Sequence, residues 1–259
     1  MTRIDLNSDI GEACDHLPVD SDDAVLEHVT SANIACGFHA GDPTTMQRTV
    51  AAALRHGVAI GAHPSLADRA GFGRRETDIS PHDAYALVVY QVGALAALAH
   101  AAGARLAHVK PHGALYNMAA RDPVLAAAIA QAVTDVDASL VLVGLAGSAL
   151  PAAGARLGLR VAHEAFADRA YEADGRLSPR GETGAVIDDI ERAVVQAVAI
   201  ATRGEAVARS GETVRIRADT LCVHGDRADA GEFARRLRAG LFDAGVDVRA
   251  PRQAGATAG

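Results

Sequence analysis

Polar side chains that can take part in chemistry recur in this sequence directly after short β-branched segments. In chain order they are Asn7, Asp9, Glu12, His39, His63, Lys110, His112, Glu164, Asp168, Arg169, His224 and Asp226. Carboxylates and imidazoles can transfer protons near neutral pH, and together they can bind a divalent metal ion. Each residue alone also fits an ordinary loop or turn. Because six of the β-branched segments are followed by such residues, we favour one common site for them.

Two groups among these residues suggest specific chemistry. Asp9, His39 and His63 could hold a divalent metal that activates water, or could act without a metal as histidine bases oriented by a carboxylate. Lys110 is the only lysine among the 25 lysines and arginines of the chain. A compact ammonium at a strand end offers a charge to a carboxylate, a phosphate or a developing oxyanion.

Two longer loops are rich in arginine. One follows His63 and contains Asp68–Arg75, and the other covers 164–184 and contains Arg169 and Arg180. Loops of this length in a compact domain often cover or bind a substrate. Arginine can hold a carboxylate or phosphate through two parallel hydrogen bonds. We therefore expect substrate contacts from both loops, with a solvated surface loop as the competing interpretation.

Alternating strands and helices must position these residues. The predicted strands are Arg3–Asn7, Asn33–Gly37, Val58–Ala62, Leu106–Lys110, Leu140–Gly144, Leu159–His163 and Thr220–His224. The predicted helices are Ser21–Ser31, Pro43–His56, Ser80–Ala102, Pro123–Thr134, Ser148–Leu157, Ala185–Thr202 and Asp229–Ala244. Asp42, Ser80 and Asp122 each precede a proline, which is the pattern of a capping residue before the first helical position.

Seven strands, each followed by a helix, predict a parallel sheet that is either closed into a barrel or open and doubly wound. The chain has neither a glycine-rich dinucleotide turn nor a P-loop motif, so we expect a closed, TIM-like (β/α) barrel of seven strands. Its 259 residues suit one such barrel, with a single catalytic domain over 1–250 and a disordered tail over 251–259. The strand ends of a barrel share one face, where active sites lie.

The composition excludes several classes of protein. A net charge of −7, a pI near 5.8 and 3% aromatic residues argue against nucleic acid as a partner. Cys14, Cys36 and Cys222 are too few and too irregular for a disulfide framework or a zinc ribbon. The N-terminus has no apolar leader, and the apolar stretch 86–102 is typical of a buried helix rather than a membrane span. We therefore expect a cytoplasmic protein that binds no membrane.

Several long motifs resemble the LamB/YcsF family of lactam-utilisation proteins. They lie at Asp5–Glu12, Ala32–Asp42, Gly61–Pro64, Gly71–Arg75, Val109–Asn117 and Glu164–Arg169, and the resemblance continues to Asp226. The resemblance implies a barrel related to the glycoside hydrolase and polysaccharide deacetylase superfamily. It also implies an ATP-dependent 5-oxoprolinase that opens 5-oxo-L-proline to L-glutamate, with ADP and phosphate released, in a complex with subunits B and C. Magnesium would accompany ATP as its counter-ion, and no dedicated metal is predicted.

Within this hypothesis the residues divide into two roles. The expected catalytic residues are Asp9, His39, His63, Lys110, His112 and Glu164. The expected substrate-binding residues are Asn7, Glu12, Asp168, Arg169, Arg180, His224 and Asp226. Asp9 with His63 or His112 would prepare a water, and Lys110 would face the lactam oxygen or a phosphate.

Two alternatives stay open. One is a deacetylase-like metal hydrolase that acts without ATP. The other is a non-catalytic subunit that only binds the cyclic amide.

Overall fold

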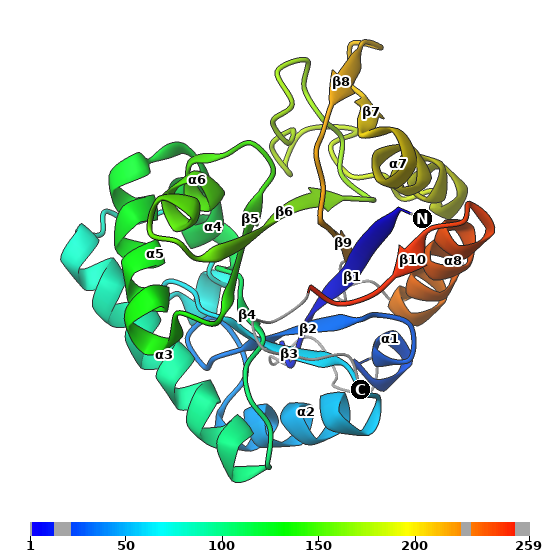
Figure 1. Cartoon of the computed structure of the whole chain (residues 1–259). Helices are drawn as coiled ribbons and strands as arrows, with labels where there is room; N and C mark the ends of the chain where they lie inside the picture. Colours follow the sequence, from blue (N-terminus) through cyan, green and yellow to red (C-terminus); the bar gives the residue numbers. More distant parts are fainter. Residues whose placement is uncertain (1, 13–21, 224–228, 252–259) are drawn as a thin grey trace.

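The computed structural model describes residues 2–12, 22–223 and 229–251. Within these ranges seven parallel strands form a barrel: β1 (Arg3–Ile10), β2 (Ser31–Ala35), β3 (Ala59–His63), β4 (His108–Val109), β5 (Val141–Leu145), β6 (Arg160–Phe166) and β9 (Thr220–Val223). β9 pairs with both β6 and β1, which closes the barrel (Figure 1). The predicted seven-stranded, TIM-like barrel is confirmed. The predicted tail beyond 251 lies outside the described residues.

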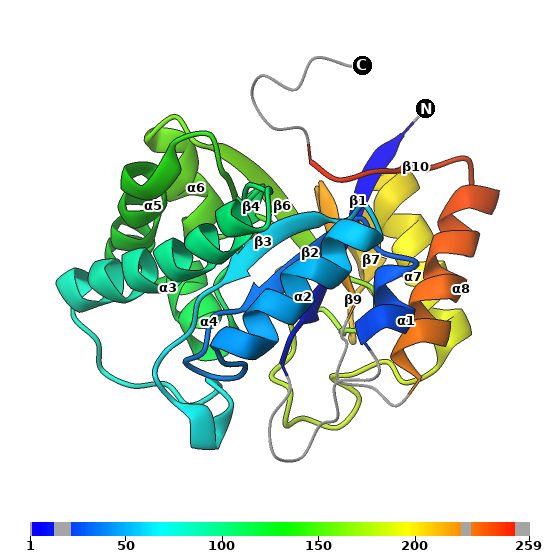
Figure 2. The same cartoon turned by 90° about the horizontal axis from the view of Figure 1, so that it is seen from below.

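Helices surround the barrel (Figure 1). They are α1 (Asp22–Leu26), α2 (Pro43–Arg55), α3 (Pro81–Ala101), α4 (Gly113–Arg121), α5 (Pro123–Asp137), α6 (Ala149–Arg156), α7 (Ile190–Arg203) and α8 (Ala230–Asp243). A 3-10 helix, η2 (Arg69–Gly71), follows β3. The short strand β7 (Glu205–Val207) pairs with β8 (Thr213–Arg215), and β10 (Asp247–Val248) pairs with the start of β1. In Figure 2, η2 and the loop after β6 lie at one end of the barrel and β10 lies at the other.

Side chains alternate between the two faces of each strand. In β1, Ile4 and Leu6 belong to the main apolar core, together with residues of the surrounding helices. Asn7, the next residue of β1, points to the other face and contacts Asn33 of β2 and Thr220 of β9 inside the barrel. The largest apolar core therefore lies between barrel and helices, and the barrel interior is free to hold polar chemistry.

The interior is tightly packed between β3 and β4. The buried imidazole of His108 donates a hydrogen bond of 2.7 Å to Asn33 Oδ1. A Cβ atom on Gly61 would lie 2.0 Å from His108 Nε2. Only glycine therefore leaves room for this ring at position 61.

The helix starts that were inferred from capping residues are confirmed. Asp42 accepts a hydrogen bond of 2.9 Å from Thr45 N, and Asp122 accepts one of 2.8 Å from Val124 N. Two other helix boundaries are wrong by five residues, α5 ends at Asp137 instead of Thr134, and α4 has no counterpart in the prediction.

Tertiary contacts explain both wrong boundaries. α1 ends at Leu26 instead of Ser31, because the Thr30 hydroxyl binds β1: it donates to Asp5 Oδ1 at 2.7 Å and accepts from Leu6 N at 3.0 Å. α7 begins at Ile190 instead of Ala185, because 186–187 stay extended and Ile187 N bonds to the backbone after β6.

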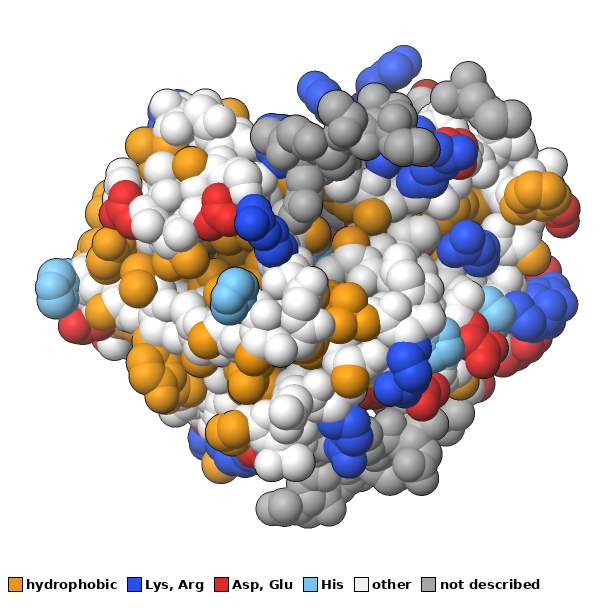
Figure 3. Space-filling view, turned by 60° about the horizontal axis from the view of Figure 1, so that its bottom comes forward, with side chains coloured by type: hydrophobic (Ala, Val, Ile, Leu, Met, Phe, Trp, Pro, Cys, Tyr) orange, Lys and Arg blue, Asp and Glu red, His pale blue; other side chains and the backbone are white. Residues whose placement is uncertain are grey.

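α3 is long and apolar enough to cross a membrane by length and composition alone. It packs against α5, α2 and β3, so it is a covering helix of a soluble barrel. Its outer face is also apolar, since the Tyr90 side chain there is 64% exposed. Hydrophobic side chains gather on this side of the molecule (Figure 3).

Candidate active site

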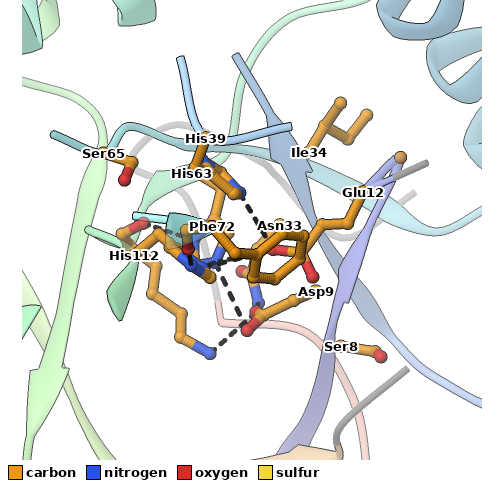
Figure 4. A network of polar contacts seen from close by, with 12 residues as sticks. Ser8, Asp9, Glu12, Asn33, Ile34, His39, His63, Ser65, Phe72 and His112 are labelled. Carbon is orange, nitrogen blue, oxygen red and sulfur yellow. Dashed lines mark hydrogen bonds and ion pairs between the residues drawn. The ribbon is translucent and has the colours of Figure 1, made fainter. Parts of the chain in front are cut away.

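Three imidazoles and one carboxylate meet at the carboxyl ends of β1 to β4 (Figure 4). His63 is the last residue of β3, while Glu12, His39 and His112 lie just beyond β1, β2 and β4. One donor atom from each residue lies within 4.8 Å of those of the others. Glu12 Oε1 is 3.0 Å from His39 Nε2 and 3.2 Å from His112 Nδ1. A donor set of this composition can bind a divalent metal.

Backbone carbonyls fix the orientation of two of these rings. His63 Nδ1 donates to the Lys110 carbonyl at 2.7 Å, and His112 Nε2 donates to the Phe72 carbonyl at 2.9 Å. Phe72 is the one described residue other than glycine with a positive φ, at 55°, where it caps η2. The remaining ring nitrogens, His63 Nε2 and His112 Nδ1, face each other at 2.9 Å.

Lys110 lies at the centre of a second, deeper network. Its Nζ atom is 2.9 Å from Asp9 Oδ1, 2.8 Å from Glu164 Oε1, and 3.2 Å from both Asn7 Oδ1 and Cys222 Sγ. An ammonium has three N–H donors, and these neighbours can use all of them. These contacts fit a positioning role for Lys110, and its expected contact with a lactam oxygen or phosphate stays a prediction.

Burial and pairing determine the protonation of this network. Burial opposes the charged form of Lys110, but the Asp9 and Glu164 carboxylates outweigh it and raise the pKa of Lys110 well above its usual value. Burial would raise the pKa of Asp9, but His63 and Lys110 outweigh it and hold that pKa well below its usual value. Burial lowers the pKa of His39 to about 4. The site thus contains an ionised Asp9, a protonated Lys110 and a neutral His39.

The deepest part of the network is closed by hydroxyl groups. Asp5 accepts hydrogen bonds from Thr30 at 2.7 Å, Ser31 at 2.8 Å and Thr220 at 2.6 Å. Burial raises the pKa of Asp5 in spite of these bonds. Asn7 and Glu164 lie between this layer and the lysine and do not line the cavity described next. Their contacts are with the protein, and their predicted roles remain predictions.

A cavity of about 1140 Å³ opens over the site. Among its lining residues are the predicted Asp9, Glu12, His63, Lys110, His112, Arg169 and Arg180. Seven arginines contribute to its wall: Arg74, Arg121, Arg169, Arg176, Arg180, Arg215 and Arg217. The cavity therefore joins an acid–base floor to a basic wall that suits an anionic ligand.

Other predicted residues lie away from the cavity surface. His39 is fully buried behind the ring of His112, on which it stacks with centroids 3.8 Å apart. Asp168 is buried in the loop after β6. His224 and Asp226 lie outside the described residues.

Two neighbours of the site, Asn33 and His108, are not among the residues predicted from the sequence. Asn33 donates to Asp9 Oδ1 at 2.8 Å and to Asn7 Oδ1 at 2.7 Å. His108 contacts Asn33 from β4, which is separated from β2 by β3 alone. Side chains two residues apart on a strand point to the same face, so His108 could have been predicted from its place two residues before Lys110.

Comparisons with known proteins agree with this architecture. The model of the LamB/YcsF family matches residues 4–256. The A subunit of the 5-oxoprolinase of Bordetella pertussis is 59% identical over 247 residues, which cover 95% of this chain and 98% of that protein.

Solved structures extend the comparison to the fold. The lactam utilization protein of Thermus thermophilus superposes with a TM-score of 0.90 at 46% identity, and the match covers 96% of this chain and all of that one. A protein of Enterococcus faecalis that is assigned to cellobiose-phosphate cleavage shares the fold alone, with a TM-score of 0.58 at 13% identity and coverage of 95% and 96%. This chain is a member of the LamB/YcsF family.

Proposed function

We propose that this protein is the A subunit of an ATP-dependent 5-oxoprolinase, which opens 5-oxo-L-proline to L-glutamate in the cytoplasm. The main support is the similarity, over 95% of this chain, to the A subunit of a bacterial 5-oxoprolinase. The cavity, in which the ionised Asp9 lies beside His63, supports it further. Subunits B and C are the partners. Magnesium accompanies ATP as its counter-ion.

ATP is needed because the amide carbon of a lactam is a poor electrophile. Transfer of a phosphoryl group to the lactam oxygen gives an imidate-like phosphate. Water adds to its carbon, the C–N bond breaks as the nitrogen takes a proton, and the acyl phosphate that results is hydrolysed to a carboxylate and phosphate. This sequence consumes one ATP and two waters and needs a base, a proton donor and anion contacts.

The cavity offers each of these groups. Asp9 Oδ2 is 3.3 Å from His63 Nε2, and both line the cavity, so this pair can accept a proton from water. Lys110 and Asn33 hold Asp9 Oδ1 and leave Oδ2 directed at His63. The arginine wall attracts the carboxylate and phosphate of the activated substrate.

The test is to measure ADP and glutamate formed from 5-oxoproline by this chain alone, by B and C together, and by all three. We expect glutamate only from the complete set. Glutamate from this chain alone would overturn the proposal that it works as one subunit of a complex.

The convergence of Glu12, His63 and His112 favours one second candidate, a metal-dependent hydrolase that opens an amide without ATP. Glutamate formation that persists without ATP and stops on addition of a chelator would select this candidate.

A further inference from the structure

We propose that Glu12, His63 and His112 form a binding site for one divalent transition metal ion, zinc being the best match, with an open coordination position towards the cavity. This inference deepens the proposed function, but it does not depend on which substrate is opened. It also replaces the set expected from the sequence, since it leaves out Asp9 and His39 as ligands.

Backbone carbonyls determine which nitrogen of each histidine ring faces inward. A carbonyl oxygen can only accept, so His63 carries its proton on Nδ1 and His112 carries its proton on Nε2. That leaves His63 Nε2 and His112 Nδ1 as the two inward nitrogens, 2.9 Å apart, and each offers a lone pair whenever it carries no proton. Two lone pairs at this distance repel each other unless a proton or a metal ion lies between them, so these two nitrogens are placed to share one cation. Backbone carbonyls that hold the outer nitrogen of a metal-binding histidine are the usual support of such sites.

The three donor atoms form a triangle of the size that a zinc ion requires. Its sides are 2.9 Å from His63 Nε2 to His112 Nδ1, 3.2 Å from His112 Nδ1 to Glu12 Oε1, and 3.7 Å from His63 Nε2 to Glu12 Oε1. A point about 1.9 Å from all three atoms lies in their plane, and a small displacement gives the bonds of about 2.0–2.1 Å that zinc forms with nitrogen. The three atoms thus match one face of a zinc tetrahedron.

The stacking of His39 shows why it is not a fourth ligand. Its ring is nearly parallel to that of His112, at 6°, with centroids 3.8 Å apart. An imidazole binds a metal in its own plane, and two parallel planes this far apart cannot share one ion. His39 Nε2 instead donates to Glu12 Oε1 at 3.0 Å and orients that carboxylate.

Asp9 lies next to the site but is held by other partners. Its Oδ1 accepts from Lys110 and Asn33. Its Oδ2 is 3.3 Å from His63 Nε2, and Asp9 lines the cavity. With the metal on His63 Nε2, Asp9 alone, and no longer the Asp9–His63 pair, is left to orient or deprotonate water.

The test is zinc binding by the full chain, freed of metal by a chelator and titrated with zinc against a chromophoric competitor. We expect one ion per chain. His112→Ala and Glu12→Gln should lose more affinity than the roughly 10–100-fold that loss of a supporting residue costs. His39→Gln, whose amide can still donate to Glu12, should lose less. His163→Gln, a histidine on the cavity wall outside the triangle, is the matched control and should bind as the parent does.

Circular dichroism establishes that each variant is folded. Less than one ion per ten chains at saturating zinc, or equal affinity in the parent and in both ligand variants, would overturn the site. Bound zinc in this chain, with no turnover of 5-oxoproline by the complete set of this chain with B and C, would leave the site standing and remove the proposed function. Turnover without bound metal would do the reverse.

Discussion

Lys110 and Asp9 form an ion pair across the barrel, with 2.9 Å between Nζ and Oδ1, and both side chains are largely withdrawn from solvent at 3% and 13% exposure. Charges are costly to bury unless they are paired and hydrogen-bonded. Here the same ammonium also binds Glu164 at 2.8 Å, so one cation compensates two carboxylates. The pair keeps Asp9 ionised and in place at the cavity floor.

Removal of this cation should destabilise the fold. Lys110→Met leaves Asp9 and Glu164 buried without their partner, and loss of one member of a buried pair costs about 3–5 kcal/mol. Urea unfolding measures the change. Arg235→Met is the matched control, because its ion pair with Glu232 is half exposed on α8 and should cost less than about 1 kcal/mol. Equal losses in both variants would show that Lys110 has no special role in stability.

Replacement of the carboxylate should stop hydrolysis without unfolding the protein. Asp9→Asn keeps the size of the side chain but removes the base and its negative charge. We expect glutamate formation by the reconstituted complex to fall by about 100- to 10,000-fold, the usual contribution of a general base. Wild-type turnover would mean that the partner subunits perform the chemistry and that this chain only binds substrate.

His108 should make the protein sensitive to acid. Burial, followed by the charge of Lys110, lowers the pKa of His108 from 6.5 to about 3. Between these values the unfolded chain binds a proton at this ring and the native state does not, so stability is lost as the pH falls from about 6.5 towards 3.

The variant His108→Gln tests this effect, since its amide can still donate to Asn33 and does not titrate. We expect a flatter dependence of the unfolding free energy on pH, measured with urea in the presence of a chelator. His82→Gln, at a 90% exposed side chain on α3, should leave the dependence unchanged. An unchanged profile in His108→Gln would contradict the prediction.

Gly61 should be essential for the packing of the same ring. Gly61→Ala places a Cβ atom 2.0 Å from His108 Nε2, and the ring cannot move without losing its bond to Asn33. We expect a loss of at least about 1–3 kcal/mol, the usual cost of overpacking.

A second glycine provides the control. Gly93→Ala in α3 meets no atom within 4 Å and should raise the stability by up to about 1 kcal/mol, because alanine favours a helix. In a double-mutant cycle, His108→Ala should relieve most of the loss caused by Gly61→Ala. Simple additivity of the two losses would show that the ring is not the cause.

The sequence by itself determined that the chain folds as a barrel and which end of the barrel carries the polar residues. Short β-branched segments, longer apolar helices and capping residues such as Asp42 and Asp122 are local patterns, and local patterns follow from backbone sterics and hydrogen bonding. Because all strands are parallel, Asp9, His63 and Lys110 could be assigned to one face before any contact was known.

The tertiary structure decided what those residues do to one another. The closure of β9 onto β1 and β6 puts Lys110 between the carboxylates of Asp9 and Glu164, where it supports Asp9. The carbonyls of Lys110 and Phe72 select which nitrogen of His63 and of His112 faces inward. Distances across a barrel and the direction of a ring nitrogen depend on residues far apart in the chain, so no local pattern contains them.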